Sequence, residues 1–79
     1  MDIKQAFGIT IREFRNKKGI SQELYALSIG LDRTYYASVE NGRRNISLQN
    51  IKKIADGFEV SLSELFESID LIMNNGEDM

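Results

Sequence analysis

The sequence predicts a single all-α domain made of five short helices, and three observations support this prediction. Apolar residues recur at three- and four-residue spacing along most of the chain, which is typical of amphipathic helices. A residue that can cap a helix start precedes each of these segments, and glycine follows the first three. No segment of four to eight residues alternates strictly between apolar and polar side chains, so we expect no sheet.

The first two helices are expected to begin after the capping residues Asp2 and Ser21. Gly19 ends the first helix, and Gly30 suits the left-handed turn that ends the second at about Ile29. The apolar stripe of the first helix consists of Ile3, Ala6, Phe7, Thr10, Ile11 and Phe14.

The other three helices are expected to begin after Asp32, Ser47 and Ser61. The third runs to about Asn41. Ser61 and the glutamate three residues later form a capping box for the fifth helix. The predicted buried face of the fourth helix is Leu48, Ile51, Ile54, Ala55 and Phe58. Along one side of the fifth helix lie Leu62, Leu65, Phe66, Ile69, Ile72 and Met73.

A chain of 79 residues corresponds to one small domain, which we expect to cover residues 1–73 and to be followed by a frayed acidic tail at 74–79. The sequence has no cysteine and no histidine, which excludes disulfides, thiolate chemistry and the common zinc-ligand sets. There is also no glycine-rich phosphate loop, so we expect no enzyme activity and no cofactor. We expect a cytoplasmic protein, because no apolar run is long enough to cross a membrane and no signal segment opens the chain.

Charge is distributed unevenly along the chain. Residues 1–55 contain all ten lysines and arginines and five acids, for a net charge of +5, whereas residues 56–79 contain seven acids and no base. The total is −2. Such asymmetry predicts a part that binds a polyanion and a separate acidic end.

The second and third helices are joined by a connection of about three residues, "GLD". Two short helices joined so tightly, with glycine in the turn, are typical of a DNA-binding helix-turn-helix. Ala26 is small where the two helices must approach closely, Gly30 supplies the turn, and Val39 is apolar where the third helix faces the core. The sequence therefore predicts a helix-turn-helix.

The stretch from "KKGISQ" to "SELF" resembles the Cro/phage-repressor type of helix-turn-helix domain, which implies a five-helix, lambda-repressor-like fold. The short segments "LDRTY", "RRN" and "VSLSELF" are similar to segments of the controller proteins of restriction–modification systems. This resemblance implies a homodimeric transcription regulator that binds palindromic operators, with one or two dimers on each. It does not specify the operator sequence, the regulated genes, dimer–dimer cooperativity, or activation as against repression. Two alternatives stay open: a stand-alone phage-type repressor, and an antitoxin-like adaptor of the same fold that binds another protein.

A recognition helix contacts base edges in the major groove with residues near its N-terminus. The predicted base contacts are therefore Arg33, Thr34, Tyr35 and, from the following loop, Arg44. Arginine suits guanine because its forked donors match the O6 and N7 acceptors. The predicted phosphate contacts are Arg15, Gln22, Arg43 and Asn45, of which Gln22 and the loop residues are implied by the resemblance.

The resemblance also raises two expectations about the interior. It implies that Glu40 pairs with Arg15 or Arg12 of the first helix and so holds the helix-turn-helix in place. Tyr25 and Tyr36 stand where the family normally has buried aliphatic residues, and a buried tyrosine hydroxyl needs a hydrogen-bond partner.

A palindromic site requires two recognition helices about 34–36 Å apart, related by a two-fold axis. The fifth helix and the end of the fourth provide a candidate dimer surface, with acids around it. Its predicted residues are Phe58, Val60, Leu62, Leu65, Phe66 and Ile69.

Overall fold

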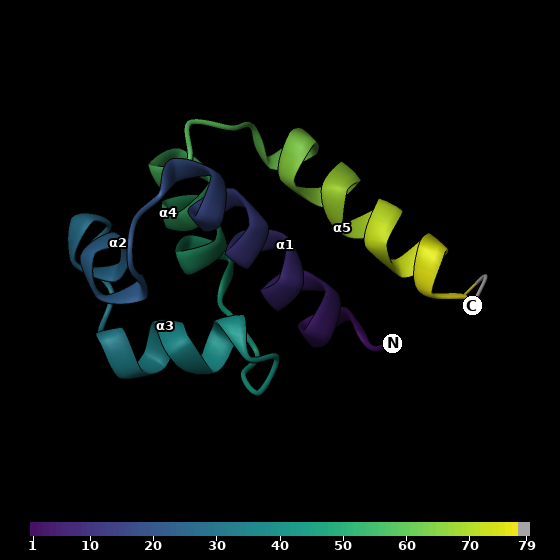
Figure 1. The fold of residues 1–79 in the computed structure, drawn as a ribbon, viewed down its shortest axis with the longest axis horizontal. Coiled ribbons are helices and arrows are strands. Elements are labelled where there is room, and N and C mark those ends of the chain that lie inside the picture. Colours follow the sequence, from purple (N-terminus) through teal and green to yellow (C-terminus); the bar gives the residue numbers. More distant parts are fainter. Residues whose placement is uncertain (78–79) are drawn as a thin grey trace.

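The computed structural model describes residues 1–77, which form five α-helices and no strand (Figure 1). The all-α prediction is confirmed. The helices are α1 (Ile3–Lys18), α2 (Gln22–Ser28), α3 (Arg33–Glu40), α4 (Leu48–Gly57) and α5 (Leu62–Glu77). None of the helices within this range is long and apolar enough to span a bilayer.

The capping residues determine where the helices begin. Asp2 and Gln5 exchange hydrogen bonds between their side chains and backbone amides, at 3.0 and 3.2 Å. The side chains of Ser21, Asp32 and Ser47 each accept from the amide three residues later, as does that of Ser61. Caps of this kind stabilise a helix by about 1 kcal/mol each. The predicted starts of the helices are confirmed.

The predicted domain boundary at residue 73 falls inside helix α5. Helix α5 continues to Glu77, because no proline interrupts it and the packed turns before it propagate the helical hydrogen bonds. The remainder of the predicted tail, residues 78–79, lies outside the described residues.

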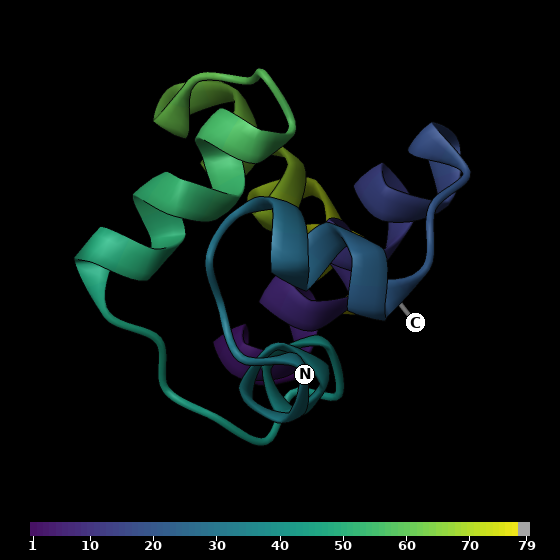
Figure 2. The same cartoon turned by 90° about the vertical axis from the view of Figure 1, so that its left-hand side faces the viewer.

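Helix α1 lies in the middle of the fold, between α3 on one side and α5 on the other (Figure 1). Figure 2 views the molecule from the α2–α3 side, where α2 crosses α3. A glycine inside a helix is normally unfavourable, but Gly8 is the point at which α1 crosses the end of α3. A Cβ atom there would lie 2.3 Å from the carbonyl oxygen of Glu40, so only glycine permits this approach.

The core contains a stack of aromatic rings. The ring of Tyr25 stacks on Phe58 at a centroid distance of 4.3 Å, and Phe58 stacks on Phe14 at 5.4 Å. The Tyr25 hydroxyl donates to the carbonyl oxygen of Ile54 at 2.7 Å, as a buried hydroxyl requires. The hydroxyl of Tyr36 is also buried, but it forms no hydrogen bond with any of the described residues. Burial raises the pKa of both tyrosines.

Four residues differ in exposure from at least one prediction made for them. Leu48 is 81% exposed, because it is the first residue of α4 and no earlier turn covers it. Phe58, Leu65 and Ile69, which were predicted for the dimer surface, are buried inside the subunit; for Phe58 this agrees with its place on the predicted buried face of the fourth helix. Phe58 belongs to the aromatic stack. Leu65 and Ile69 lie four residues apart on α5, on the side of that helix that is buried in the core.

Candidate nucleic-acid interface

Helices α2 and α3 form the predicted helix-turn-helix. Gly30 adopts a left-handed φ of 75°, and the amide of Leu31 donates to the carbonyl oxygen of Ala26 at 2.9 Å, which closes the turn. Ala26 and Val39 are both buried, as predicted. The turn therefore holds the start of α3 at a defined angle to α2.

The first turn of α3 presents Arg33 and Thr34 to solvent. The guanidinium Nη1 of Arg33 lies 3.1 Å from Oε2 of Glu23 on α2, and the two side chains are 64% and 69% exposed. An exposed ion pair contributes at most about 1 kcal/mol, so Arg33 can exchange this partner for a ligand at little cost. Arg33 and Glu23 line an open concavity of about 620 Å³ between α2 and α3. The other residues that line it are Arg15, Ser21, Gln22, Thr34 and Ala37.

Tyr35 is half-buried, in contrast to its two predecessors. Its hydroxyl accepts a hydrogen bond from Nδ2 of Asn50 on α4 at 3.2 Å. The guanidinium of Arg44 lies over its ring, 5.1 Å from the centroid. Tyr35 thus connects α3, the α3–α4 loop and α4.

The α3–α4 loop carries the other predicted contacts. Arg43, Arg44 and Asn45 are all exposed. The loop leaves α3 through Gly42, which has a left-handed φ of 74° and packs against Gln5 of α1. The structure therefore brings Arg44 next to Tyr35 of the recognition helix and leaves Arg43 and Asn45 accessible.

Glu40 is the centre of a buried polar group that joins α1, α2 and α3. Its carboxylate accepts from Arg15 at 2.6 and 3.0 Å, from Arg12 at 3.2 Å and from the Gln22 amide at 2.9 Å. The expected pairing of Glu40 with an arginine of the first helix is confirmed, and both candidate arginines take part. We call Glu40, Arg12, Arg15 and Gln22 the Glu40 cluster.

The predicted phosphate contact at Arg15 needs correction. Its side chain is only 12% exposed, and its third hydrogen bond goes to the carbonyl oxygen of Ile20 at 2.8 Å. Arg15 is therefore committed to the interior, because a buried carboxylate requires a counter-charge. Gln22 is half-buried and donates to the same carboxylate, which leaves only part of its amide free for a phosphate.

The Glu40 cluster strongly perturbs ionisation. Burial by itself would raise the pKa of Glu40, but the hydrogen bonds from Arg15, Gln22 and Arg12 outweigh burial and lower this pKa to about 2. The same carboxylate raises the pKa of Arg15. Both groups are therefore charged at neutral pH.

Sequence reasoning missed two residues of this interface, Asn50 and Glu23. Neither has a recognisable spacing to its partner: Asn50 lies 15 residues from Tyr35, and Glu23 lies 10 residues from Arg33. No local pattern in the sequence relates these residues, so only the packing of the helices identifies them.

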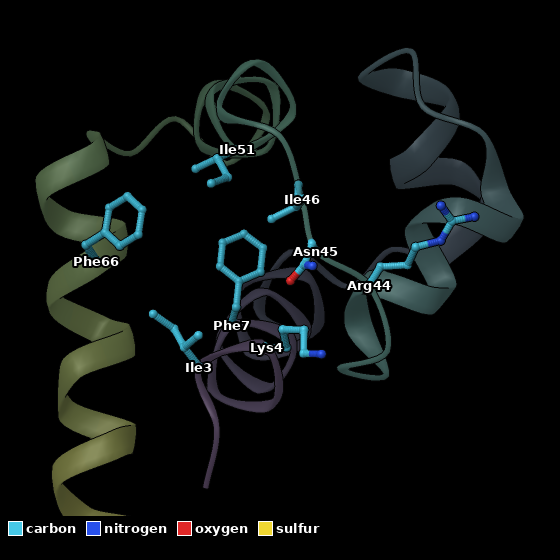
Figure 3. A pocket seen from close by; sticks show the side chains of 8 residues that line it. All are labelled: Ile3, Lys4, Phe7, Arg44, Asn45, Ile46, Ile51 and Phe66. Carbon is cyan, nitrogen blue, oxygen red and sulfur yellow. The ribbon is translucent and has the colours of Figure 1, made fainter.

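An apolar pocket of about 350 Å³ lies where α1, the α3–α4 loop, α4 and α5 meet (Figure 3). Phe7, Ile46 and Ile51 line it together with Ile3 and Phe66, and Lys4, Arg44 and Asn45 complete the lining. Of the predicted dimer residues, Leu62 and Phe66 are each 39% exposed and Val60 is half-buried. Three of the six predicted dimer residues are thus at least partly exposed, and the pocket adds Ile3 to this surface.

Comparisons with known proteins agree with this geometry. The family profile described as Helix-turn-helix matches residues 11–65. The control protein C.MunI of a Mycoplasma species is 51% identical over 70 residues, which cover 87% of this chain and 95% of that protein.

Two solved structures are similar over most of the chain. The restriction–modification controller protein C.AhdI from Aeromonas hydrophila is 47% identical, with a TM-score of 0.75, over 78% of this chain and 94% of that one. The controller protein C.Esp1396I, solved as a tetramer in complex with its natural 35-base-pair operator, is 32% identical, with a TM-score of 0.79, over 87% of this chain and 91% of that one. The chain therefore belongs to the Cro/phage-repressor-type helix-turn-helix family, within which it stands with the control proteins of restriction–modification systems.

Proposed function

We propose that this protein is a sequence-specific DNA-binding transcription regulator that acts as a homodimer on a palindromic operator and controls restriction–modification genes in the cytoplasm. The observation that carries the proposal is the pair of exposed residues Arg33 and Thr34 on the first turn of α3, in a chain 51% identical to a control protein. The operator complex of C.Esp1396I supports it by analogy.

In the proposed complex, the first turn of α3 enters the major groove. Arg33 leaves Glu23 and donates two hydrogen bonds to a guanine, and Thr34 contacts the neighbouring base through its hydroxyl or methyl group. Exchanging an exposed ion pair for a charge-assisted, two-point hydrogen bond is favourable, because the guanine edge matches the guanidinium fork.

Phosphate contacts then fix the orientation of α3 in the groove. Arg43 and Asn45 are exposed in the loop after α3 and are the proposed donors on one side. Gln22 is the proposed donor on the other side, with the part of its amide that Glu40 leaves free. Such contacts provide affinity and register but carry no sequence information.

The proposed dimer buries the exposed apolar residues near α5. Leu62 and Phe66 are large and accessible, and the apolar pocket beside Phe66 offers a concave surface for a second copy. Glu64, Glu67 and Asp70 on α5 are exposed, and their charge would repel DNA from that end of the molecule. A dimer built on this surface keeps both α3 helices available for the duplex.

The decisive experiment measures affinity for DNA against salt. Duplexes enriched by the protein from a randomised library serve as the operator, and fluorescence anisotropy gives the affinity at several salt concentrations. We expect the logarithm of the binding constant to fall linearly with the logarithm of salt, by about 0.9 for each phosphate neutralised.

The same experiment tests the adaptor alternative. Failure to enrich any duplex, together with salt-independent binding to another protein that is lost on Phe66→Ala, would favour an adaptor. An adjacent pair of methyltransferase and endonuclease genes in the genome would separate a controller from a stand-alone repressor.

A further inference from the structure

We infer that Tyr35 is a positioning residue, which acts in operator binding by holding Arg44 against the recognition helix and not primarily by contacting a base. The inference rests on the proposed function. It follows from three features of the structure: the anchoring of the Tyr35 ring, the environment of the Arg44 guanidinium, and the anchoring of the loop that carries Arg44.

The Tyr35 ring is fixed at its outer end. Its hydroxyl accepts from Nδ2 of Asn50 at 3.2 Å, so the ring is tied to α4 although it belongs to α3. The backbone amide of Tyr35 donates to the capping carboxylate of Asp32 at 2.9 Å. A half-buried ring held in this way is poorly placed to leave its position and enter a groove, whereas Arg33 and Thr34 are free to do so.

Arg44 differs from Arg12, Arg15 and Arg33 in what it packs against. Arg12, Arg15 and Arg33 each form an ion pair with a carboxylate. Among the described side chains, those of residues 1–75, no carboxylate forms an ion pair with Arg44; its guanidinium lies over the face of Tyr35, at a distance typical of a cation–π contact. An aromatic face holds a cation without neutralising it, so the full positive charge of Arg44 stays available to DNA.

The base of the Arg44 side chain is also fixed. Ile46, two residues later, packs into the apolar pocket beside Phe7 and Ile51, and Figure 3 shows the Arg44 guanidinium directed away from that pocket. The loop is thus anchored by Ile46, and the end of the arginine is held by Tyr35. A long side chain that is ordered before binding loses less conformational entropy on contact with a phosphate or base.

A double-mutant cycle tests this inference on the duplex that the wild-type protein enriches. We expect Tyr35→Leu and Arg44→Ala each to weaken binding by about 5- to 30-fold for a dimer with two half-sites, which is the fold-change that cation–π contacts of ordinary strength predict. If Tyr35 acts through Arg44, the double variant binds as Arg44→Ala does. Tyr35→Phe retains the ring and should keep most of the affinity.

The matched control is Tyr35→Leu combined with Arg33→Ala, for which the two losses should multiply, because Arg33 packs against Glu23 and not against Tyr35. Multiplying losses in the Arg44 cycle would overturn the inference and leave the proposed function intact. Failure of the wild-type protein to enrich any duplex would contradict both.

A measurement without DNA covers the case in which Tyr35→Leu folds poorly. In the free protein, the side-chain protons of Arg44 should show upfield ring-current shifts in NMR spectra, which persist in Tyr35→Phe. Unshifted Arg44 resonances in the wild-type protein would contradict the packing and with it the inference.

Discussion

The carboxylate of Glu40 and the guanidinium of Arg15 are joined by two hydrogen bonds, at 2.6 and 3.0 Å, across the crossing of α1 and α3. The Glu40 side chain is fully buried, and Arg12 and Gln22 complete its coordination. This arrangement fixes the recognition helix to the scaffold, since α1 contacts both α3 and α5. The orientation of α3 toward DNA therefore depends on a buried ion pair.

The first prediction concerns pH. The pKa of Glu40 lies near 2 in the folded protein, below its ordinary value of 4.5, so its ionised form stabilises the fold above that value. This stabilisation is lost as pH falls from about 4.5 to 2 and is on the order of 3 kcal/mol. Urea unfolding of the wild-type protein and Glu40→Gln at pH 7, 5 and 3 measures it. The variant should be less stable at pH 7, and the difference should shrink toward pH 3; a difference that does not change with pH would contradict the assignment.

The two buried tyrosines should respond differently to removal of the hydroxyl. Tyr25→Phe loses the hydrogen bond to the Ile54 carbonyl and should lower the free energy of unfolding by about 1 kcal/mol. Tyr36→Phe removes a buried hydroxyl without a partner among the described side chains of residues 1–75, so its effect should be neutral or slightly stabilising. Chemical denaturation of both variants provides the comparison, in which each is the control for the other. An equal cost at both positions would mean that Tyr36 donates to Glu40.

The proposed dimer surface is tested by placing a charge on it. Phe66→Asp should shift the protein to a monomer, because an interface cannot bury an unpaired carboxylate cheaply, while the partly exposed position tolerates it in the subunit. Sedimentation velocity measures the oligomeric state, and circular dichroism checks that the variant is folded. Leu27→Asp, at a more exposed leucine on α2, is the matched control and should leave the dimer unchanged. If the Phe66→Asp variant remained a dimer, the dimer interface would have to lie on another surface of the protein.

Arg33→Ala should reduce discrimination at one base step in each half-site by about 1–3 kcal/mol, while its affinity for unselected DNA changes little. Anisotropy titrations with the enriched duplex and its single-base variants measure this. Lys53→Ala, which removes an exposed cation from α4, is the matched control and should leave the sequence preference unaltered. If Arg33→Ala weakened the affinity for every duplex equally, Arg33 would contact a phosphate and not a base.

Some features of the site were predictable and others were not. The exposure of Arg33 and Thr34 follows from their place just after the capping residue Asp32, since the first turn of a helix-turn-helix recognition helix points outward. The burial of Arg15 does not follow in this way. Basic residues at the end of a helix are usually solvated, and the pairing of Arg15 or Arg12 with Glu40 was expected only from the family resemblance and not from any pattern near Arg15.

The dimer surface illustrates the same limit. A helical repeat identifies an apolar stripe, but it does not say which part of that stripe a neighbouring helix covers. On α5 the core takes Leu65 and Ile69 and leaves Leu62 and Phe66 partly exposed. That division depends on how the helix is rotated against the rest of the domain, which is a property of the packed structure.

The amino-acid sequence alone determined where each helix begins and which short segment concentrates the arginines, because capping and amphipathic spacing act between residues three or four positions apart. Only the tertiary structure decided that both Arg15 and Arg12 reach Glu40, across 25 and 28 residues, and that Arg44 lies over Tyr35. Contacts between such distant positions have no local signature, since they arise only when the helices pack.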